Sequence, residues 1–217
     1  MQFERVLLLE EDYALLPDIL NTLELLSKNK HDFVSLGNYV NNLNLTAHLT
    51  KFPNSSFTFD HSYFSSSENN MGLTFSSDFI EKLLSFGVDF CLYDDYNWDF
   101  SLMHLSTEIS KPPWLVVSPL LSRVQHLGVK TCGTHITDKG ATECRVDEIR
   151  QQFQNDMKSQ NITRSLFPSK MVETSKPKKL VTRRPFRSGG WGDPRDIKLC
   201  LSFIEGETNL ETLRSMT

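Results

Sequence analysis

Three consecutive acids, Glu10, Glu11 and Asp12, follow the apolar run of residues 5–9. Such a run predicts a fully buried strand of the kind that occurs in the parallel sheet of an α/β fold. Because ligands gather at the carboxyl ends of strands in open α/β sheets, these carboxylates could hold a hard divalent cation beside a nucleotide diphosphate. The alternative is a solvated acidic cap that precedes the next helix.

A second cluster combines three acids with three aromatic residues in seven positions, Tyr93-Asp94-Asp95-Tyr96-Asn97-Trp98-Asp99. Aromatic rings offer stacking faces for sugars, and a carboxylate can accept a proton from a hydroxyl group. The same pattern also fits a helix N-terminus whose acids face the helix dipole and whose aromatic side chains enter the core. The residues alone leave both interpretations open.

Two further features could contribute to a site. His126 follows an apolar segment and could be a metal ligand, although a lone histidine is usually a partnered surface or core residue. Trp191 lies among three glycines in the run of residues 189–193. Glycine allows the backbone to approach either a ligand or another segment closely, so this loop has both a functional and a structural interpretation.

The elements expected around these residues alternate between strands and helices. Strands are predicted at residues 5–9, 33–36, 71–75 and 114–117, and helices at residues 17–29, 78–84 and 94–105. The first helix should bury a stripe formed by Leu16, Ile19, Leu20, Leu23 and Leu26, and the second should be capped by Ser77 or Asp78. Residues 148–179 are polar and predict a mobile segment, whereas residues 197–203 predict a closing helix or strand.

Composition places limits on the class of protein. A chain of 217 residues with a net charge of −4 suits one soluble domain, and it does not suggest a nucleic-acid partner. Four cysteines without a Cys-x-x-Cys pair, together with sequons at Asn44, Asn54 and Asn161, favour disulfides and the secretory pathway. No apolar run is long enough to span a bilayer. Because the expected buried strand begins at residue 5, we expect the chain to start inside a domain.

These segments occur in the same order in the N-acetylglucosaminyltransferase II family, which the chain resembles over nearly its whole length. The matching segments are Leu9-Glu10-Glu11-Asp12, Ser35-Leu36-Gly37, residues 68–73, residues 90–99, His126 with Gly128, and residues 189–196 followed by Leu199-Cys200. The run of residues 93–99, joined to the later Gly-Gly-Trp-Gly-Asp, is the most specific part. Other acidic-motif glycosyltransferases share the Glu-Glu-Asp triplet without that pair.

The resemblance implies a Rossmann-like, metal-dependent fold of the GT-A type, of which residues 1–217 would be the C-terminal portion of one catalytic domain. It implies inverting transfer of N-acetylglucosamine from UDP-GlcNAc to the 2-hydroxyl of the α1,6-linked mannose of an N-glycan acceptor. The expected location is the lumenal side of the Golgi membrane. The membrane anchor and most uridine contacts of the family would belong to sequence that precedes residue 1.

The resemblance also assigns roles residue by residue. Asp12 and His126 would bind Mn²⁺, and Asp99 would be the catalytic base. Acceptor contacts would come from Asn70, Tyr96 and Trp98, and supporting positions would be Glu10, Glu11, Asp94, Asp95 and Trp191. The disulfides implied are Cys91 with Cys200 and Cys132 with Cys144. The family also carries an Arg that meets the sugar nucleotide, but residues 38–50 contain none, so this contact is not carried over.

Three other functions compete with the transferase. One is a related N-acetylglucosaminyltransferase that acts on another mannose arm, and only the run of residues 93–99 argues against it. A chain without a donor site could be a non-catalytic glycan-binding or structural fragment that keeps only the aromatic and glycine-bearing loops. A metal-dependent phosphodiesterase would need several histidine and aspartate ligands, often for two metals, and only His126 is well placed for that.

Overall fold

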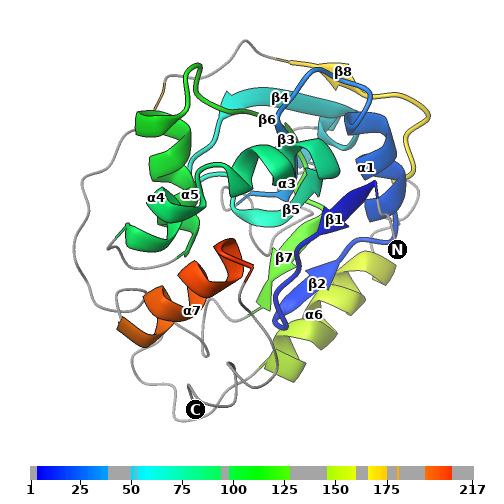
Figure 1. Cartoon of the computed structure of the whole chain (residues 1–217). Helices are drawn as coiled ribbons and strands as arrows, with labels where there is room; N and C mark the ends of the chain where they lie inside the picture. Colours follow the sequence, from blue (N-terminus) through cyan, green and yellow to red (C-terminus); the bar gives the residue numbers. More distant parts are fainter. Residues whose placement is uncertain are drawn as a thin grey trace.

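The computed structural model describes residues 4–38, 50–51, 53–93, 98–127, 146–159, 166–174, 180 and 194–206. Its described residues form a six-stranded mixed sheet in the order β1-β5-β3-β6-β4-β8 and a two-stranded ribbon of β2 and β7 (Figure 1). The strands are β1 (Arg5–Leu7), β2 (Tyr13–Leu15), β3 (Phe33–Gly37), β4 (Thr58–Tyr63), β5 (Met71–Ser76), β6 (Leu115–Pro119), β7 (Val124–His126) and β8 (Val172–Glu173). The fold is therefore α/β, as the sequence predicts.

Helices cover both faces of the large sheet because successive residues of its central strands point in opposite directions. On β3, Phe33 packs in a cluster with Phe79 and Trp114, whereas its neighbour Val34 packs with Ile19 on the other face. The helices are α1 (Ile19–Leu26), α3 (Ser77–Leu84), α4 (Gly87–Leu92), α5 (Trp98–His104), a π-helical turn at Leu105–Ile109, α6 (Val146–Ser159) and α7 (Pro194–Ile204). A short 3₁₀ turn lies at Ser55–Phe57.

The first strand corrects one expectation. The strand β1 is at the edge of the sheet and pairs antiparallel with β5, whereas a fully buried strand in a parallel sheet was predicted. Leu8 and Leu9 follow it with exposed fractions of 40% and 44%. Among the described residues no strand lies on the outer side of β1, which explains why an apolar run that suits a central strand is only half-buried here.

Most other predicted elements are present with shifted ends. Helix α1 lies inside the predicted range, but Leu20 is 69% exposed and does not belong to the buried stripe. Helix α3 is capped by Ser76, whose side chain accepts a hydrogen bond from the Phe79 amide, and not by Ser77 or Asp78. The segment predicted to be mobile contains helix α6, and residues 197–203 belong to helix α7.

The ribbon of β2 and β7 packs closely against strand β5 at Gly72. This glycine has φ +60°, and a Cβ atom there would lie 2.7 Å from Cγ2 of Val124 on β7. A larger residue would therefore push β7 away from β5 and would also strain the backbone. The glycine thus allows the ribbon to lie directly on the sheet.

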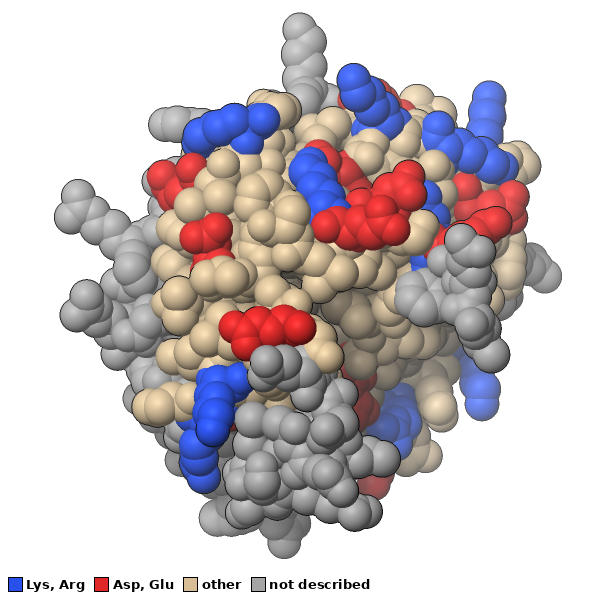
Figure 2. Space-filling model, viewed as in Figure 1, with Lys and Arg blue, Asp and Glu red and all other residues tan. Residues whose placement is uncertain are grey.

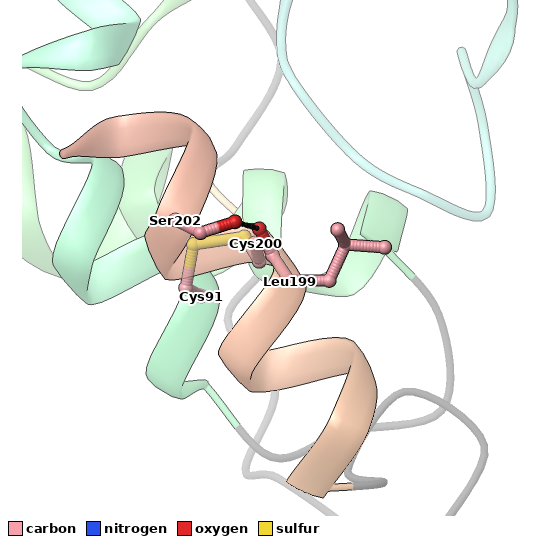
Figure 3. The surroundings of a disulfide bond; sticks show 4 residues. All are labelled: Cys91, Leu199, Cys200 and Ser202. Atoms are coloured by element: carbon pink, nitrogen blue, oxygen red, sulfur yellow. Dashed lines mark hydrogen bonds between the residues drawn. A yellow bond between two sulfur atoms is a disulfide. The ribbon is translucent and has the colours of Figure 1, made fainter. Parts of the chain in front are cut away.

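A disulfide between Cys91 and Cys200 joins α4 to α7, as the family resemblance implies (Figure 3). It links residues 109 apart in sequence, with a Cα–Cα distance of 5.6 Å. Beside it, the Ser202 hydroxyl donates a hydrogen bond to the Leu199 carbonyl at 2.8 Å. The predicted bridge between Cys132 and Cys144 lies outside the described residues.

On the face seen in Figure 2, acidic and basic side chains of the described residues alternate. No helix in the described part of the chain is both long enough and apolar enough to cross a membrane.

Candidate active site

The two predicted metal ligands lie side by side because the β2–β7 ribbon aligns them. Tyr13 is paired with His126 in the antiparallel register, and the Leu127 amide donates to the Asp12 carbonyl at 2.9 Å. Asp12 therefore stands immediately before one strand and His126 at the end of the other. Nε2 of His126 lies 3.2 Å from Oδ2 of Asp12.

Glu10 completes this cluster. One possible ligand atom from each of Glu10, Asp12 and His126 lies within 4.8 Å of the others. The chain turns back between these acids, since the Tyr13 amide donates to the Glu10 carbonyl at 3.2 Å. Tyr13 also hydrogen-bonds the Glu10 side chain and presents its ring edge-on to His126, with centroids 5.7 Å apart. Tyr13 thus holds both neighbours of the cluster in place.

The electrostatic environment connects this cluster with Asp99. Burial raises the pKa of the Glu10 carboxyl above its usual value, and the hydrogen bond from Tyr13 opposes that shift. The charges of Asp12, Glu11 and Asp99 raise the pKa further. Asp99 is the last and smallest of these contributions, so its charge acts on Glu10 more weakly than those of Asp12 and Glu11.

The cluster has the chemistry of a divalent metal site. It offers two carboxylates and one imidazole, a donor set that suits Mn²⁺ or a similar ion. Oδ1 of Asp12 is buried and has no hydrogen-bond partner among the described residues. A buried acceptor of this kind is costly unless something binds it, and a cation would satisfy it. The residues present therefore fit a bound metal.

Asp99 lies in the first turn of α5 and is 5% exposed. Its Oδ2 accepts a hydrogen bond from Nδ2 of Asn70 at 2.7 Å and another from the hydroxyl of Ser66. Both donors come from the turn between β4 and β5. A buried carboxylate is stable as an anion only when donors of this kind replace water, so the arrangement favours an ionised Asp99.

A buried ion pair anchors the segment that leads into strand β7 of the β2–β7 ribbon. Nε of Arg123, three residues before His126, donates to Oδ2 of Asp18 at 3.0 Å, and both side chains are fully buried. The guanidinium also donates to the carbonyls of Leu121 and Ser56, at 2.7 and 2.8 Å. Burial lowers the pKa of Arg123, and the charge of Asp18 and its hydrogen bond oppose that shift. The ion pair joins the start of α1 to the segment that leads into β7.

Among the predicted residues, Glu10, Asp12 and His126 form one cluster, and Asn70 hydrogen-bonds Asp99. Glu11 is exposed in the turn before β2, and its charge acts on Glu10. Trp98 is half-buried and packs against the core cluster of Phe33 and Trp114. Predicted residues that lie outside the described part of the chain are Asp94, Asp95, Tyr96, Trp191, Cys132 and Cys144.

Three residues of the site were not predicted. Ser66 and Tyr13 contact predicted site residues, whereas Arg123 anchors the segment that leads to His126, and none of the three belongs to a motif that the sequence marks as chemical. The only signal was a run of three serines, Ser65-Ser66-Ser67, beside the predicted acceptor-binding Asn70.

Comparison with known proteins shows the family to which the chain belongs. A family model described as N-acetylglucosaminyltransferase II (MGAT2) matches residues 2–200. The chain therefore belongs to the N-acetylglucosaminyltransferase II family of glycosyltransferases.

Curated relatives carry the name alpha-1,6-mannosyl-glycoprotein 2-beta-N-acetylglucosaminyltransferase. The protein from Rattus norvegicus is 33% identical over 204 residues, which cover 91% of this chain and 43% of the rat protein. The human protein is 31% identical over 204 residues, covering 91% of this chain and 42% of its own length. The chain thus spans less than half the length of these relatives.

Proposed function

We propose that this chain contributes the metal-binding and acceptor-facing part of an enzyme that transfers N-acetylglucosamine from UDP-GlcNAc to the 2-hydroxyl of the α1,6-linked mannose of an N-glycan. Family membership and the names of the relatives support the reaction class. The proposal includes a GT-A type fold and an inverting mechanism. A mixed sheet covered by helices on both faces is consistent with that fold.

One observation carries the proposal. The ligand atoms of Glu10, Asp12 and His126 converge within 4.8 Å of one another, and a second carboxylate, Asp99, is buried and accepts hydrogen bonds from Ser66 and Asn70. A glycosyl transfer with a diphosphate leaving group needs both a cation site and a base. The departing diphosphate requires a positive counter-charge, and the attacking hydroxyl requires a base.

In the proposed mechanism Asp12 and His126 hold Mn²⁺, with Glu10 beside them. When bound, the ion would offset the negative charge that develops on the UDP leaving group. Asp99 accepts the proton of the mannose 2-hydroxyl, and the oxygen of that hydroxyl forms a bond to C1 of the N-acetylglucosamine. The bond from C1 to the diphosphate oxygen breaks on the opposite side, so the configuration at C1 is inverted.

The acceptor is proposed to contact Asn70, Tyr96 and Trp98. Asn70 is the residue that the described structure supports best, because its Nδ2 holds Asp99 while its Oδ1 is buried without a hydrogen-bond partner among the described residues. That oxygen could accept a hydrogen bond from a sugar hydroxyl. Binding the acceptor next to the base would supply much of the rate enhancement.

The proposed location is the lumenal side of the Golgi membrane. The Cys91–Cys200 disulfide supports an oxidising compartment, because such bonds rarely persist in the cytosol.

The substitution Asp99→Asn tests the mechanism in protein expressed from its complete transcript, with UDP-GlcNAc, Mn²⁺ and an α1,6-mannose acceptor. Loss of the base should lower kcat by about 10²- to 10⁴-fold without unfolding the protein. The control is Asp89→Asn, which neutralises an exposed acid on α4 and should leave turnover unchanged. Near-normal turnover of Asp99→Asn would remove Asp99 as the base. An inactive wild-type protein that still binds the glycan would favour the non-catalytic alternative.

A further inference from the structure

The turn between β4 and β5 is held by hydrogen bonds of Asn69 to the backbone of the turn and to strand β4. Oδ1 of Asn69 accepts from the Ser65 amide at 2.8 Å, and Nδ2 of Asn69 donates to the Ser62 hydroxyl at 2.8 Å. The Asn69 amide also donates to the Ser65 carbonyl at 3.0 Å. Because Asn69 is only 2% exposed, these contacts hold the turn from inside.

This rigid turn presents two donors to one oxygen of Asp99. Ser66 and Asn70 both belong to this turn, are 4% and 8% exposed, and both donate to Oδ2. Asp99 itself is on α5, so the contact joins a sheet connection to a helix that is about 30 residues away in sequence. Two donors that converge on one oxygen fix the rotation of a carboxylate better than one donor can.

We infer that Ser66 is a positioning residue for the proposed reaction and that, together with Asn70, it holds Asp99 in the direction from which it accepts the acceptor's proton. This inference rests on the proposed function, since it assumes that Asp99 is the base. Ser66 itself does not need to touch either substrate. Its hydroxyl acts through Asp99 by fixing the carboxylate and by stabilising its ionised form.

Two effects should follow from removing the hydroxyl. A carboxylate that loses one of its donors can rotate, and a small misplacement of a catalytic group lowers kcat strongly. A lost hydrogen bond to an anion also favours the protonated form, so the base should titrate at higher pH. Substitution of a residue that merely stabilised the turn would neither lower kcat selectively over KM nor shift the pH profile.

The test compares three substitutions in protein expressed from its complete transcript. Ser66→Ala removes the donor, and Ser66→Thr keeps a hydroxyl. Ser67→Ala is the matched control, because the exposed Ser67 hydroxyl bonds to Ser65 at 3.1 Å and belongs to the same turn. Ser66→Ala should lower kcat roughly 10- to 100-fold with KM nearly unchanged, while Ser66→Thr restores most of the loss.

The pH dependence supplies the second readout. The acid limb of the kcat/KM profile should move to higher pH by about one unit in Ser66→Ala. Since the charges of Glu10 and Asp99 also influence each other, the profile is compared with that of Ser67→Ala, in which Glu10 is unchanged. Infrared titration of the Asp99 carboxylate band, identified by its loss in Asp99→Asn, should show the same upward shift without any turnover.

The outcomes separate this inference from the proposed function. An active wild type with inactive Asp99→Asn and normal Ser66→Ala would overturn the role of Ser66 and leave the mechanism intact. A loss in Ser66→Ala that accompanies equal loss of stability, with an unshifted Asp99 band, would make Ser66 a structural residue and overturn the inference. A wild type without transferase activity would overturn the proposed function and, with it, this role of Ser66.

Discussion

At the scale of single residues, the two acids that the chemistry needs have different surroundings. The Asp12 side chain is 25% exposed beside an imidazole, whereas Asp99 is 5% exposed beside a hydroxyl and an amide. A partly open carboxylate next to a nitrogen ligand suits a cation that must also reach phosphate oxygens. An enclosed carboxylate with fixed donors suits proton transfer. Environment, rather than residue type, therefore divides the roles of the two acids.

The substitution Asp12→Asn should weaken Mn²⁺ binding by at least about 100-fold, because it replaces an anionic oxygen by a neutral one at the centre of the cluster. Isothermal titration of the metal against wild-type and substituted protein measures this directly. Glu24→Gln is the control, since it removes an acid whose side chain is 73% exposed on α1 and should leave the affinity unchanged. Equal Mn²⁺ affinities of Asp12→Asn and the wild type would argue against the cluster as the metal site.

At the scale of elements, the β2–β7 ribbon and the start of α1 form one unit. The Leu16 amide donates to the Arg123 carbonyl at 2.9 Å, and the Arg123 amide donates to the Leu36 carbonyl at 2.7 Å. The backbone of Arg123 thus links β2, β3 and β7, while its side chain reaches Asp18. Any change that moves Arg123 should also move His126 three residues further on.

The substitution Asp18→Asn should lower the free energy of unfolding by about 3–5 kcal/mol, because it leaves the Arg123 charge buried without an anion. Urea unfolding followed by circular dichroism measures the loss. The control Asp147→Asn breaks a surface ion pair with Arg150, in which the Asp147 side chain is 95% exposed. This change should lower the free energy of unfolding by less than about 1 kcal/mol. Similar losses in the two variants would show that burial does not decide the strength of the Asp18–Arg123 pair.

The double substitution Cys91→Ser with Cys200→Ser should lower the free energy of unfolding by about 2–5 kcal/mol, because the bridge closes a loop of 109 residues. Helix α7 packs on α4, so its detachment should appear first. Hydrogen exchange of residues 194–206 reports that local event, and exchange in the central strands serves as the internal reference. Unchanged protection of α7 in the variant would mean that packing alone holds it.

The sequence predicted elements with strong apolar patterns better than their positions in the sheet. Strands β3 and β5 have the predicted bounds within about a residue, since their buried side chains are local signals. The edge position of β1 depends on which strands surround it, and no local pattern encodes that. Helix α6 has few apolar residues, so its polar composition was interpreted as irregular.

The same distinction applies to the site. Asp12, His126 and Asp99 were predicted because their motifs resemble those of a family. Ser66 lies 33 residues from Asp99 in sequence, and Arg123 lies 105 residues from Asp18. Such partners are joined by tertiary folding alone, and a serine or arginine in isolation does not indicate its partner.

At the scale of the whole molecule, histidines whose neutral form is favoured by folding make the stability depend on pH. His31 lies between α1 and β3 and shares a hydrogen bond of 2.5 Å between its Nδ1 and the Asn29 carbonyl. Burial lowers the pKa of His31 below its ordinary value of 6.5, although the contact with Asn29 opposes the shift. Burial likewise lowers the pKa of His104 at the end of α5. Both histidines therefore resist protonation in the folded state.

The sign of the pH effect follows from these depressed pKa values. Just below pH 6.5 the unfolded chain binds protons at His31 that the folded chain does not yet bind, so acidification favours unfolding. The free energy of unfolding should fall as the pH decreases from 7.5 to 5, and His31→Gln should remove part of that slope by removing the group that titrates. Urea unfolding at a series of pH values measures both slopes, with the double variant His31→Gln and His104→Gln expected to be flatter still. If His31→Gln loses as much stability on acidification as the wild type does, the burial of this histidine does not contribute to the acid sensitivity of the fold.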